Sequence, residues 1–309
     1  MGYVDMFQEK QAIRRIFPLV GRIRYFMEEL RPKMYQYFIE SDIDGRPFSR
    51  VDRATIYQRA KKTLQTIPFG TQLDVYAEGY EWMCHSMAPK AFETLDHNPR
   101  VIFGNKDCKQ PYAASILNVS AMSFGSLSDK AIEALNGGAK IGGFAHNTGE
   151  GGISDYHLKQ GGDLIWQIGT DYFGCRNEDG TFNPELFAEK AQLPNVKMIE
   201  LKISQGAKPG HGRILPASKN MEEIATICHI KPYTVVASPP FHSAFNTPLE
   251  MIQFIQEMRM LSGGKPVGFK LCIGHKSEFI SMIDGLAFVH NILTGLDIRK
   301  YIKIIASGK

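Results

Sequence analysis

A glutamate stands alone among glycines in the segment Gly149-Glu150-Gly151-Gly152. Glycines let backbone N–H groups come close to an anionic ligand, and Glu150 is then placed at the edge of that ligand. A flexible turn with a solvent-facing glutamate explains the same residues. The spacing alone does not separate a ligand-binding loop from such a turn.

Two lysines, Lys202 and Lys208, lie on either side of Gln205 at the end of the most apolar run in the chain. Lys202 alternates with Leu201 and Ile203, so on a strand its side chain points away from theirs. Such cations suit a dicarboxylate ligand or the negative charge of a cofactor. The alternative is that the ammonium groups simply reach the solvent at the rim of the sheet.

Lys270 lies within the short apolar run Gly268-Phe269-Lys270-Leu271-Cys272. If Phe269 and Leu271 face covering helices, Lys270 faces the interior of a barrel. A lysine in that position meets a ligand anion or a buried carboxylate. Of the single residues, Lys270 is the strongest candidate for a functional role.

His242 has the chemistry of a general acid or base, but the sequence shows no partner for it, which favours a structural or ligand-edge role. There is no Ser-His-Asp grouping or nucleophile elbow to support hydrolase chemistry. The five cysteines are scattered without a C-x-x-C pair, which is typical of free thiols in a reducing compartment. We therefore expect no metal site and no iron–sulfur cluster in this chain.

The elements that must position these residues are alternating strands and helices. After Pro111, short apolar runs rich in β-branched residues alternate with amphipathic stretches, and capping residues predict helices that begin near Ser128, Asn220 and Thr247. This order predicts an α/β fold with a parallel sheet covered on both faces, as a doubly wound sheet or a (β/α)₈ barrel. The predicted strands are 116–121, 196–203, 234–237, 267–272 and 302–306.

Polar or glycine-rich loops follow nearly every predicted strand, and this distribution favours the barrel. In a barrel these loops meet at one mouth, which is the active site. A dinucleotide-binding fold would instead concentrate its glycines after the first strand as G-x-G-x-x-G, with an acidic residue roughly 20 positions further on. Neither that motif nor a Walker A loop is present.

Residues 1–110 differ in composition from residues 111–309, and we expect them to form a separate helical lead-in region. Apolar residues at helical spacing predict helices over 13–17, over 23–30 ending before Pro32, and over 53–64. A membrane-surface role for its basic residues is the less favoured alternative to a solvated helix face, because acidic residues are interleaved with them.

The net charge of +4 is too small and too dispersed to indicate nucleic-acid binding. No apolar run is long enough to predict a membrane span, and the N-terminus lacks the pattern of a signal peptide. A cytoplasmic protein is expected.

Several motifs in order resemble the FMN-binding synthase domain of glutamate synthase, and most closely the shorter, stand-alone FMN-binding glutamate synthase family proteins. The resemblance covers essentially the whole chain. The matching stretches are 37–42, 68–72, 120–128, 147–152, 205–210 and 238–240.

The resemblance implies a (β/α)₈ barrel that holds FMN at its mouth. Reduced FMN delivers hydride to 2-iminoglutarate, formed from 2-oxoglutarate and ammonia, and the product is glutamate. The electron donor is not identified. If the barrel is incomplete, its exposed edges have to be covered, either in a homo-oligomer or by the N-terminal helices. By similarity, FMN is bound by Ala121, Met122, Ser123, Gln205, Lys270, Ser307 and Gly308, the 2-oxo acid by Glu150, Lys202 and Lys208, and catalysis depends on Glu150 and Lys270.

The chain also departs from the family pattern. It begins with Met1-Gly2 instead of the nucleophilic cysteine of a glutaminase domain, and the family's cluster-binding cysteines lie beyond its end. Against the family pattern we expect a strand and a phosphate-binding loop of the form D-G-x-E-G-G-T-G to be deleted around Met282, and the last helix and the eighth βα unit to be absent. With roughly six of the eight βα units present, we expect an incomplete barrel.

Three hypotheses follow. The first is a flavin oxidoreductase of the glutamate synthase type. The second is a truncated, non-catalytic remnant that does not hold FMN. The third, a weaker one, is a related FMN barrel that acts on a different 2-oxo or 2-hydroxy acid.

Overall fold

The computed structural model divides the chain into two compact units, Met1–Ala91 and Phe92–Lys309. The boundary at residue 110, chosen from composition, falls inside the second unit, and the domain division made there stays a prediction. The described residues are 2–8, 10–40, 45, 48–62, 74–82, 84, 86–104, 106, 108–206, 214–272, 294–295 and 302–305.

The first unit consists of helices close to the stretches that the apolar spacing predicted. In α4 the serine Ser49 caps the first turn, because its Oγ accepts a hydrogen bond from the N–H of Asp52 at 3.2 Å. The helices are α1 (Gly2–Phe7), α2 (Ala12–Ile16), α3 (Gly21–Met34), the π-helical η1 (Tyr35–Ile39) and α4 (Arg50–Ala60).

The predicted end of α3 before Pro32 is wrong. Pro32 lies inside the last turn of α3, and the chain continues directly into η1. Proline removes only its own N–H from the helix, and the N–H of Tyr35 still donates to the carbonyls of Arg31 and Pro32. One missing bond near a helix end therefore did not stop the helix.

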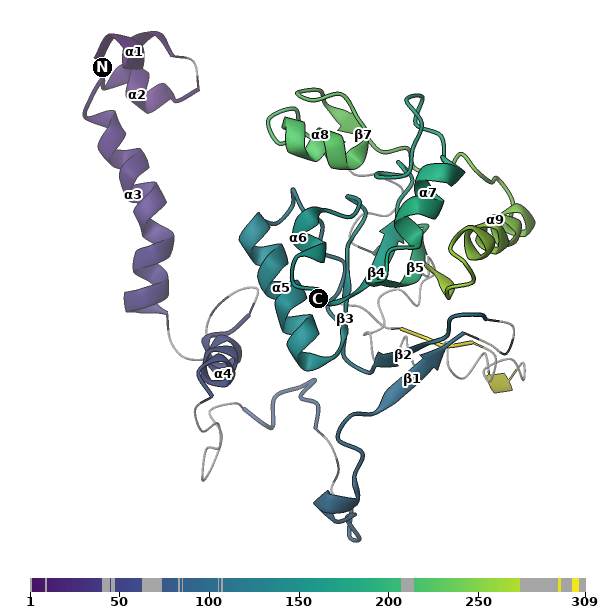
Figure 1. Ribbon diagram of the computed structural model, residues 1–309. Coiled ribbons are helices and arrows are strands. Elements are labelled where there is room, and N and C mark those ends of the chain that lie inside the picture. The colour runs from purple at the N-terminus through teal and green to yellow at the C-terminus, as the bar shows by residue number, and fades with distance from the viewer. Residues whose placement is uncertain are drawn as a thin grey trace. The chain divides into compact units, whose positions relative to one another are not determined.

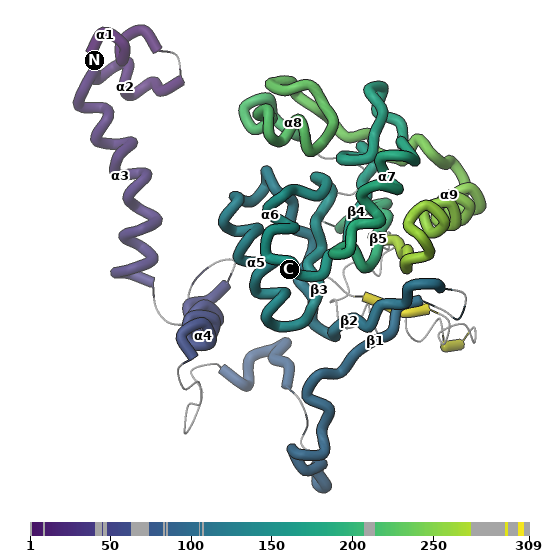
Figure 2. The backbone as a smooth tube through the Cα atoms, viewed as in Figure 1, coloured from purple at the N-terminus to yellow at the C-terminus, as the bar shows by residue number. Residues whose placement is uncertain are grey.

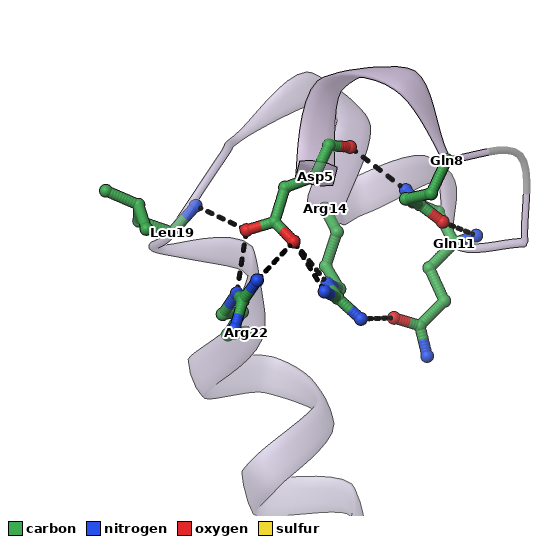
Figure 3. Close-up of polar contacts among 6 residues, drawn as sticks. All are labelled: Asp5, Gln8, Gln11, Arg14, Leu19 and Arg22. Atoms are coloured by element: carbon green, nitrogen blue, oxygen red, sulfur yellow. Dashed lines mark hydrogen bonds and ion pairs between the residues drawn. The ribbon is translucent and has the colours of Figure 1, made fainter. Parts of the chain in front are cut away.

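A buried aspartate ties the first three helices together (Figure 3). The carboxylate of Asp5 is fully buried and accepts hydrogen bonds from Arg14 Nε at 3.0 Å, Arg22 Nε at 2.7 Å and the N–H of Leu19 at 3.2 Å. These bonds, and the one from Arg22 above all, hold the pKa of the Asp5 carboxyl well below its usual range. The two arginines come from α2 and α3, so Asp5 of α1 links all three helices.

The second unit is built on a four-stranded parallel sheet (Figure 1). Its strands follow one another in the order β3 (Ala145–Asn147), β4 (Asp163–Ile168), β5 (Val196–Lys202) and β8 (Val267–Lys270). Val119 adds a parallel bridge to His146 on the outer side of β3. The parallel sheet and the strands predicted at 196–203 and 267–272 are confirmed.

One face of the sheet is covered by helices. Helix α5 (Asp129–Gly142) contacts β3 and β4, α7 (Pro184–Ala191) contacts β5, and α9 (Pro248–Leu261) contacts β8. Figure 2 traces this alternation of strand and helix along the backbone. The core between sheet and helices includes Leu164, Trp166, Ile168, Ile199, Leu201, Phe187, Phe254 and Met258.

The polarity of the other face of the sheet changes along its strands. Near the amino ends it is apolar, and Ala145, Ile165 and Met198 pack against Phe103 and Tyr112. These two aromatic residues belong to an antiparallel hairpin of β1 (Arg100–Phe103) and β2 (Tyr112–Ser115). Towards the carboxyl ends this face becomes polar, because strand residues two positions further on are Asn147, Gln167 and Glu200.

The predicted caps of two long helices are confirmed. Ser128 Oγ accepts from the N–H of Ala131 at the start of α5, and Thr247 Oγ accepts from the N–H of Glu250 at the start of α9. The cap predicted at Asn220 is wrong, because its amide instead donates to the carbonyls of Lys231 and Thr234. The remaining helices are η2 (Phe92–Thr94), α6 (Asp155–Leu158) and α8 (Glu222–Cys228).

Three strand predictions need correction. The run at 234–237 lies outside the parallel sheet, since β7 (Val236–Ala237) pairs antiparallel with β6 (Ile214–Leu215) in a separate ribbon. Of the run at 116–121 only Val119 makes a bridge, and residues 302–305 form no strand. Strands β3 and β4 were not among the predicted runs.

Within the described residues the sheet does not close into a barrel. The deletion expected around Met282 and the rim residues Ser307 and Gly308 lie outside the described part of the chain. In the part that the structure describes, no helix is long and apolar enough to cross a bilayer.

Candidate active site

The structure joins two of the predicted site residues, Glu150 and Lys202, in an ion pair at the carboxyl ends of the strands. Glu150 follows β3 and Lys202 ends β5, and their Oε2 and Nζ atoms lie 2.8 Å apart. The side chains are only 20% and 11% exposed, respectively, so the pair is largely shielded from water. Its attraction is therefore screened less than that of a surface pair.

Strand β4 lies between β3 and β5, and a glycine lets the ion pair reach across it. A Cβ at Gly169, directly after β4, would lie 2.9 Å from Glu150 Cβ and 3.0 Å from Glu150 Oε2. Any larger residue at 169 would displace the glutamate. The local sequence after β4 thus leaves the space that brings Glu150 to Lys202.

A second carboxylate, that of Glu200, lies on the same face of the sheet, two positions before Lys202 in β5. Two side-chain amides hold it. Glu200 Oε1 accepts from Asn147 Nδ2 at 3.1 Å and from Gln167 Nε2 at 2.5 Å. These side chains come from β3, β4 and β5, so they connect the three strands beneath the ion pair. Glu200 and Lys202 are two residues apart and share a face of the strand.

The sequence prediction missed this amide–carboxylate group. The signal that was available is the interruption of apolar strands by single polar residues, Gln167 in β4 and Glu200 in β5. A polar side chain in such a run has to find a hydrogen-bond partner.

Lys270, the strongest single candidate, is the cross-strand partner of Lys202. Residues that pair in register on adjacent parallel strands lie on the same face, so both lysines are on the polar face. Phe269 lies on the opposite face beside Leu201, as expected, but Phe269 and Leu271 are about half exposed. Within the described residues, no hydrogen bond or ion pair engages the Lys270 ammonium.

The segment 121–123, expected to line a flavin, is fastened to the loop that carries Glu150. The N–H of Met122 donates to the carbonyl of Asn147 at 3.0 Å. Gly149 has a φ of +67°, and a Cβ there would lie 2.3 Å from Ser123 Oγ. Glycine at 149 is therefore required both by the backbone conformation and by the close approach of the two loops.

Met122 and Ser123 thus lie beside the Glu150 loop, with Ser123 buried and Ala121 and Met122 half buried. Gln205 follows β5 and is half buried. Cys272 N–H donates to Ser204 Oγ at 2.8 Å, which joins the ends of β8 and β5 next to Gln205. Lys208 lies outside the described residues.

His242 is buried, in accordance with a structural role. Its Nε2 lies 2.9 Å from the carbonyl of Lys202, and its Nδ1 lies 3.2 Å from Tyr172 Oη. Burial lowers the pKa of His242, although its bond to the Lys202 carbonyl acts in the opposite direction. The ring is therefore neutral near pH 7 and holds the end of β5.

No group of three or more His, Cys, Asp or Glu side chains that could hold a metal ion occurs among the described residues. The charged groups at this edge are the Glu150 carboxylate and the ammonium groups of Lys202 and Lys270, with the Glu200 carboxylate held by two amides beneath them. The Lys270 ammonium, which is paired with no carboxylate among the described residues, suits an anionic ligand.

Comparison with known proteins decides the family. The conserved region of glutamate synthases matches residues 55–284, which is most of the chain and includes the whole described sheet. The chain belongs to the glutamate synthase family. The expected family resemblance is confirmed, and the family implies an α/β fold of the TIM-barrel type.

The relatives include proteins of several lengths. The glutamate synthase large subunit-like protein YerD of Bacillus subtilis is 34% identical over 313 residues, covering 89% of this chain and 59% of YerD. The ferredoxin-dependent glutamate synthase of Cyanidium caldarium is 33% identical over 174 residues, or 48% of this chain and 10% of that protein. The archaeal-type NADPH glutamate synthase of Thermotoga maritima is 33% identical over 159 residues, or 50% of this chain and 28% of that protein.

This chain therefore spans about three fifths of YerD and a smaller share of the other two relatives. Two of these names include an electron donor, ferredoxin in one and NADPH in the other.

Proposed function

We propose that this protein is a flavin oxidoreductase of the glutamate synthase type, which converts 2-oxoglutarate and ammonia into glutamate by way of 2-iminoglutarate. The observation that carries the proposal is the placement of Lys202, Lys270 and Glu150 at one edge of the sheet in a chain of this family. Lys202 is paired with Glu150, whereas the Lys270 ammonium is paired with no carboxylate among the described residues, and such an ammonium suits both a dicarboxylate and an anionic reduced cofactor.

The described residues fit FMN in two respects. The 149–152 loop carries no side chain apart from that of Glu150 and leaves its backbone groups available to a ligand, and Lys270 offers an ammonium group that no described carboxylate neutralises. FMN, when bound, supplies the hydride that reduces the imino carbon.

The protein's own residues would then divide the remaining tasks. Residues 121–123, Gln205 and Lys270 would hold the flavin, and the Lys270 ammonium would stabilise the negative charge of its reduced form. Lys202 binds a carboxylate of the 2-oxo acid and Glu150 orients Lys202 through their 2.8 Å ion pair. Lys208, Ser307 and Gly308 belong to the same proposal as ligands of substrate and FMN.

The test measures the rate at which photoreduced FMN is reoxidised in the presence of the purified full chain under anaerobic conditions. In this assay 2-oxoglutarate and ammonia are added together or singly. We expect oxidation only when both are present, with glutamate formed in equal amount. The K270M variant should lose at least tenfold in rate, and K219M, which changes an exposed lysine, should not. Equal rates in K270M and the unaltered chain would contradict the assignment of Lys270.

A second candidate is a non-catalytic remnant that does not retain FMN. The similarity to YerD extends over 313 aligned positions, but only 89% of the 309 residues of this chain take part in it. The matching part of YerD therefore contains residues that have no counterpart in this chain. This agrees with an internal loss such as that expected around Met282. A chain that takes up no FMN and oxidises no reduced FMN under these conditions would support the remnant.

The electron donor, a homo-oligomeric state and a cytoplasmic location stay predictions. Whether ferredoxin, NADPH or another reductant serves this chain is decided by supplying each to the FMN-loaded protein and following flavin reduction.

A further inference from the structure

Two buried histidines make the same kind of contact with the edge of the sheet that carries the candidate site. His157 Nε2 lies 3.1 Å from the carbonyl oxygen of Met122, and His242 Nε2 lies 2.9 Å from that of Lys202. A carbonyl oxygen only accepts hydrogen bonds, so in both rings the Nε2 carries the proton. His157 thus holds the main chain of the 121–123 segment, and His242 holds the main chain at the end of β5.

The second nitrogen of His157 contacts the residue that caps its own helix α6, and that of His242 contacts the loop after β4. His157 Nδ1 accepts from the N–H of Ser154 at 3.2 Å and lies 2.8 Å from Ser154 Oγ. His242 Nδ1 lies 3.2 Å from Tyr172 Oη. Ser154 follows the Glu150 loop after β3, and Tyr172 lies in the loop after β4. His157 therefore joins the 121–123 segment to the segment after β3, and His242 joins the loop after β4 to the end of β5.

Both rings are suited to this task because they are neutral. His157 is fully buried and His242 is 2% exposed, and burial lowers the pKa of each. A neutral imidazole has one donor and one acceptor nitrogen, which matches one carbonyl on one side and one donor on the other.

We propose that His157 and His242 are positioning residues with separate tasks: His157 holds the 121–123 backbone for the flavin, and His242 holds Lys202 for the 2-oxo acid. The two tasks differ because the two rings contact different residues: Met122 belongs to the segment proposed to line the flavin, and Lys202 belongs to the ion pair with Glu150. The proposal rests on the function proposed above. Neither histidine is assigned a contact with the reacting atoms.

The first part of the test measures ligand binding in variants of the full chain. We expect H157L to weaken FMN binding at least tenfold by fluorescence titration. H242L should leave FMN binding within threefold and raise at least tenfold the 2-oxoglutarate concentration that half-saturates the flavin difference spectrum. H157Q and H242Q, which keep a donor at the Nε2 position, should recover most of each loss. The exposed His97 provides the control H97L.

The second part does not depend on FMN. Amide hydrogen exchange, followed by mass spectrometry on the flavin-free chain, should become faster at residues 119–127 in H157L and at residues 198–204 in H242L, and not the reverse. If the unaltered chain binds no FMN, the proposed function fails, and the exchange pattern alone decides the positioning roles.

Unchanged exchange in both segments of folded leucine variants would overturn the proposal. So would equal effects of H157L and H242L on the two ligands. Should a leucine variant fail to fold, H157N or H242N replaces it, because asparagine is too short to reach the carbonyl and the same segment-specific change is then required.

Discussion

At the scale of single residues, the Glu150–Lys202 ion pair contributes to stability as well as to the site. K202M leaves the Glu150 carboxylate largely buried without its cation, and we expect the free energy of unfolding to fall by about 1–3 kcal/mol. The control is K197M on the same strand, where Lys197 and Asp163 lie 3.8 Å apart and are each 38% exposed. Its cost should stay below about 0.5 kcal/mol in urea titrations. Equal losses in the two variants would contradict the structural importance of the buried pair.

A buried histidine pair makes stability depend on pH. The rings of His146 and His157 lie 5.3 Å apart, and burial first, then the neighbouring His157, lowers the pKa of His146 from 6.5 to about 4. The unfolded chain takes up this proton near pH 6.5 but the folded chain only near pH 4. Stability from this group is therefore complete above pH 6.5 and is lost as the pH falls towards 4, by roughly 3 kcal/mol.

The measurement compares urea unfolding of the unaltered chain and H146L between pH 7 and pH 4. Because leucine takes up no proton, the variant should lose less stability on acidification than the unaltered chain. The carboxylates are common to both proteins and cancel in the comparison. Parallel curves would show that His146 does not titrate on unfolding.

The residues of the site were predictable to different degrees. Glu150 and Lys202 were identifiable because a charge stood among glycines or in an apolar strand, and alternation placed Lys270 on the face opposite to Phe269, as the register confirms. Their ion pair was not predictable, because it depends on strand register and on the space above Gly169. The same holds for the amides that hold Glu200.

At the scale of elements, the loop after β3 depends on glycine for two separable reasons. Gly149 and Gly161 have nearly equal φ values of +67° and +71°, but a Cβ at 149 would lie 2.3 Å from Ser123 Oγ and one at 161 would meet nothing within 4 Å. G161A should cost about 1 kcal/mol from backbone strain alone. G149A should cost more and also weaken FMN binding. Similar losses in both variants would show that the contact between the two loops is unimportant.

The helices of the first unit depend on Asp5. D5N removes the negative charge that Arg14 and Arg22 share, and amide hydrogen exchange over residues 2–34 of the full chain should become at least tenfold faster. The control is E28Q, which breaks the exposed pair of Arg24 and Glu28 in α3 and should leave exchange nearly unchanged. Protection that survives in D5N would show that the helices hold together without this network.

Helix starts were easier to predict than strand partners. Ser128 and Thr247 cap α5 and α9 through contacts within one turn of the chain. The run at 234–237 has the composition of a sheet strand, yet Val236 pairs with Leu215 in a separate ribbon. Composition does not determine which strands pair. Strand β8, for example, pairs directly with β5 although more than sixty residues separate them in the chain.

At the scale of the whole molecule, family membership was evident from ordered motifs and is confirmed over residues 55–284. Closure of the barrel was not decidable in this way, because it depends on pairing between strands far apart in the chain. The central claim is that the edge of the sheet formed by Glu150, Lys202 and Lys270 belongs to an FMN site.

The most direct measurement is the visible spectrum of the purified full chain after FMN has been added and the excess removed. The account predicts a retained flavin absorption band in about one equivalent per chain, reduced in G149A and K270M. A colourless protein whose circular dichroism spectrum shows that it is folded would contradict this account. Common ancestry alone would then explain the family resemblance.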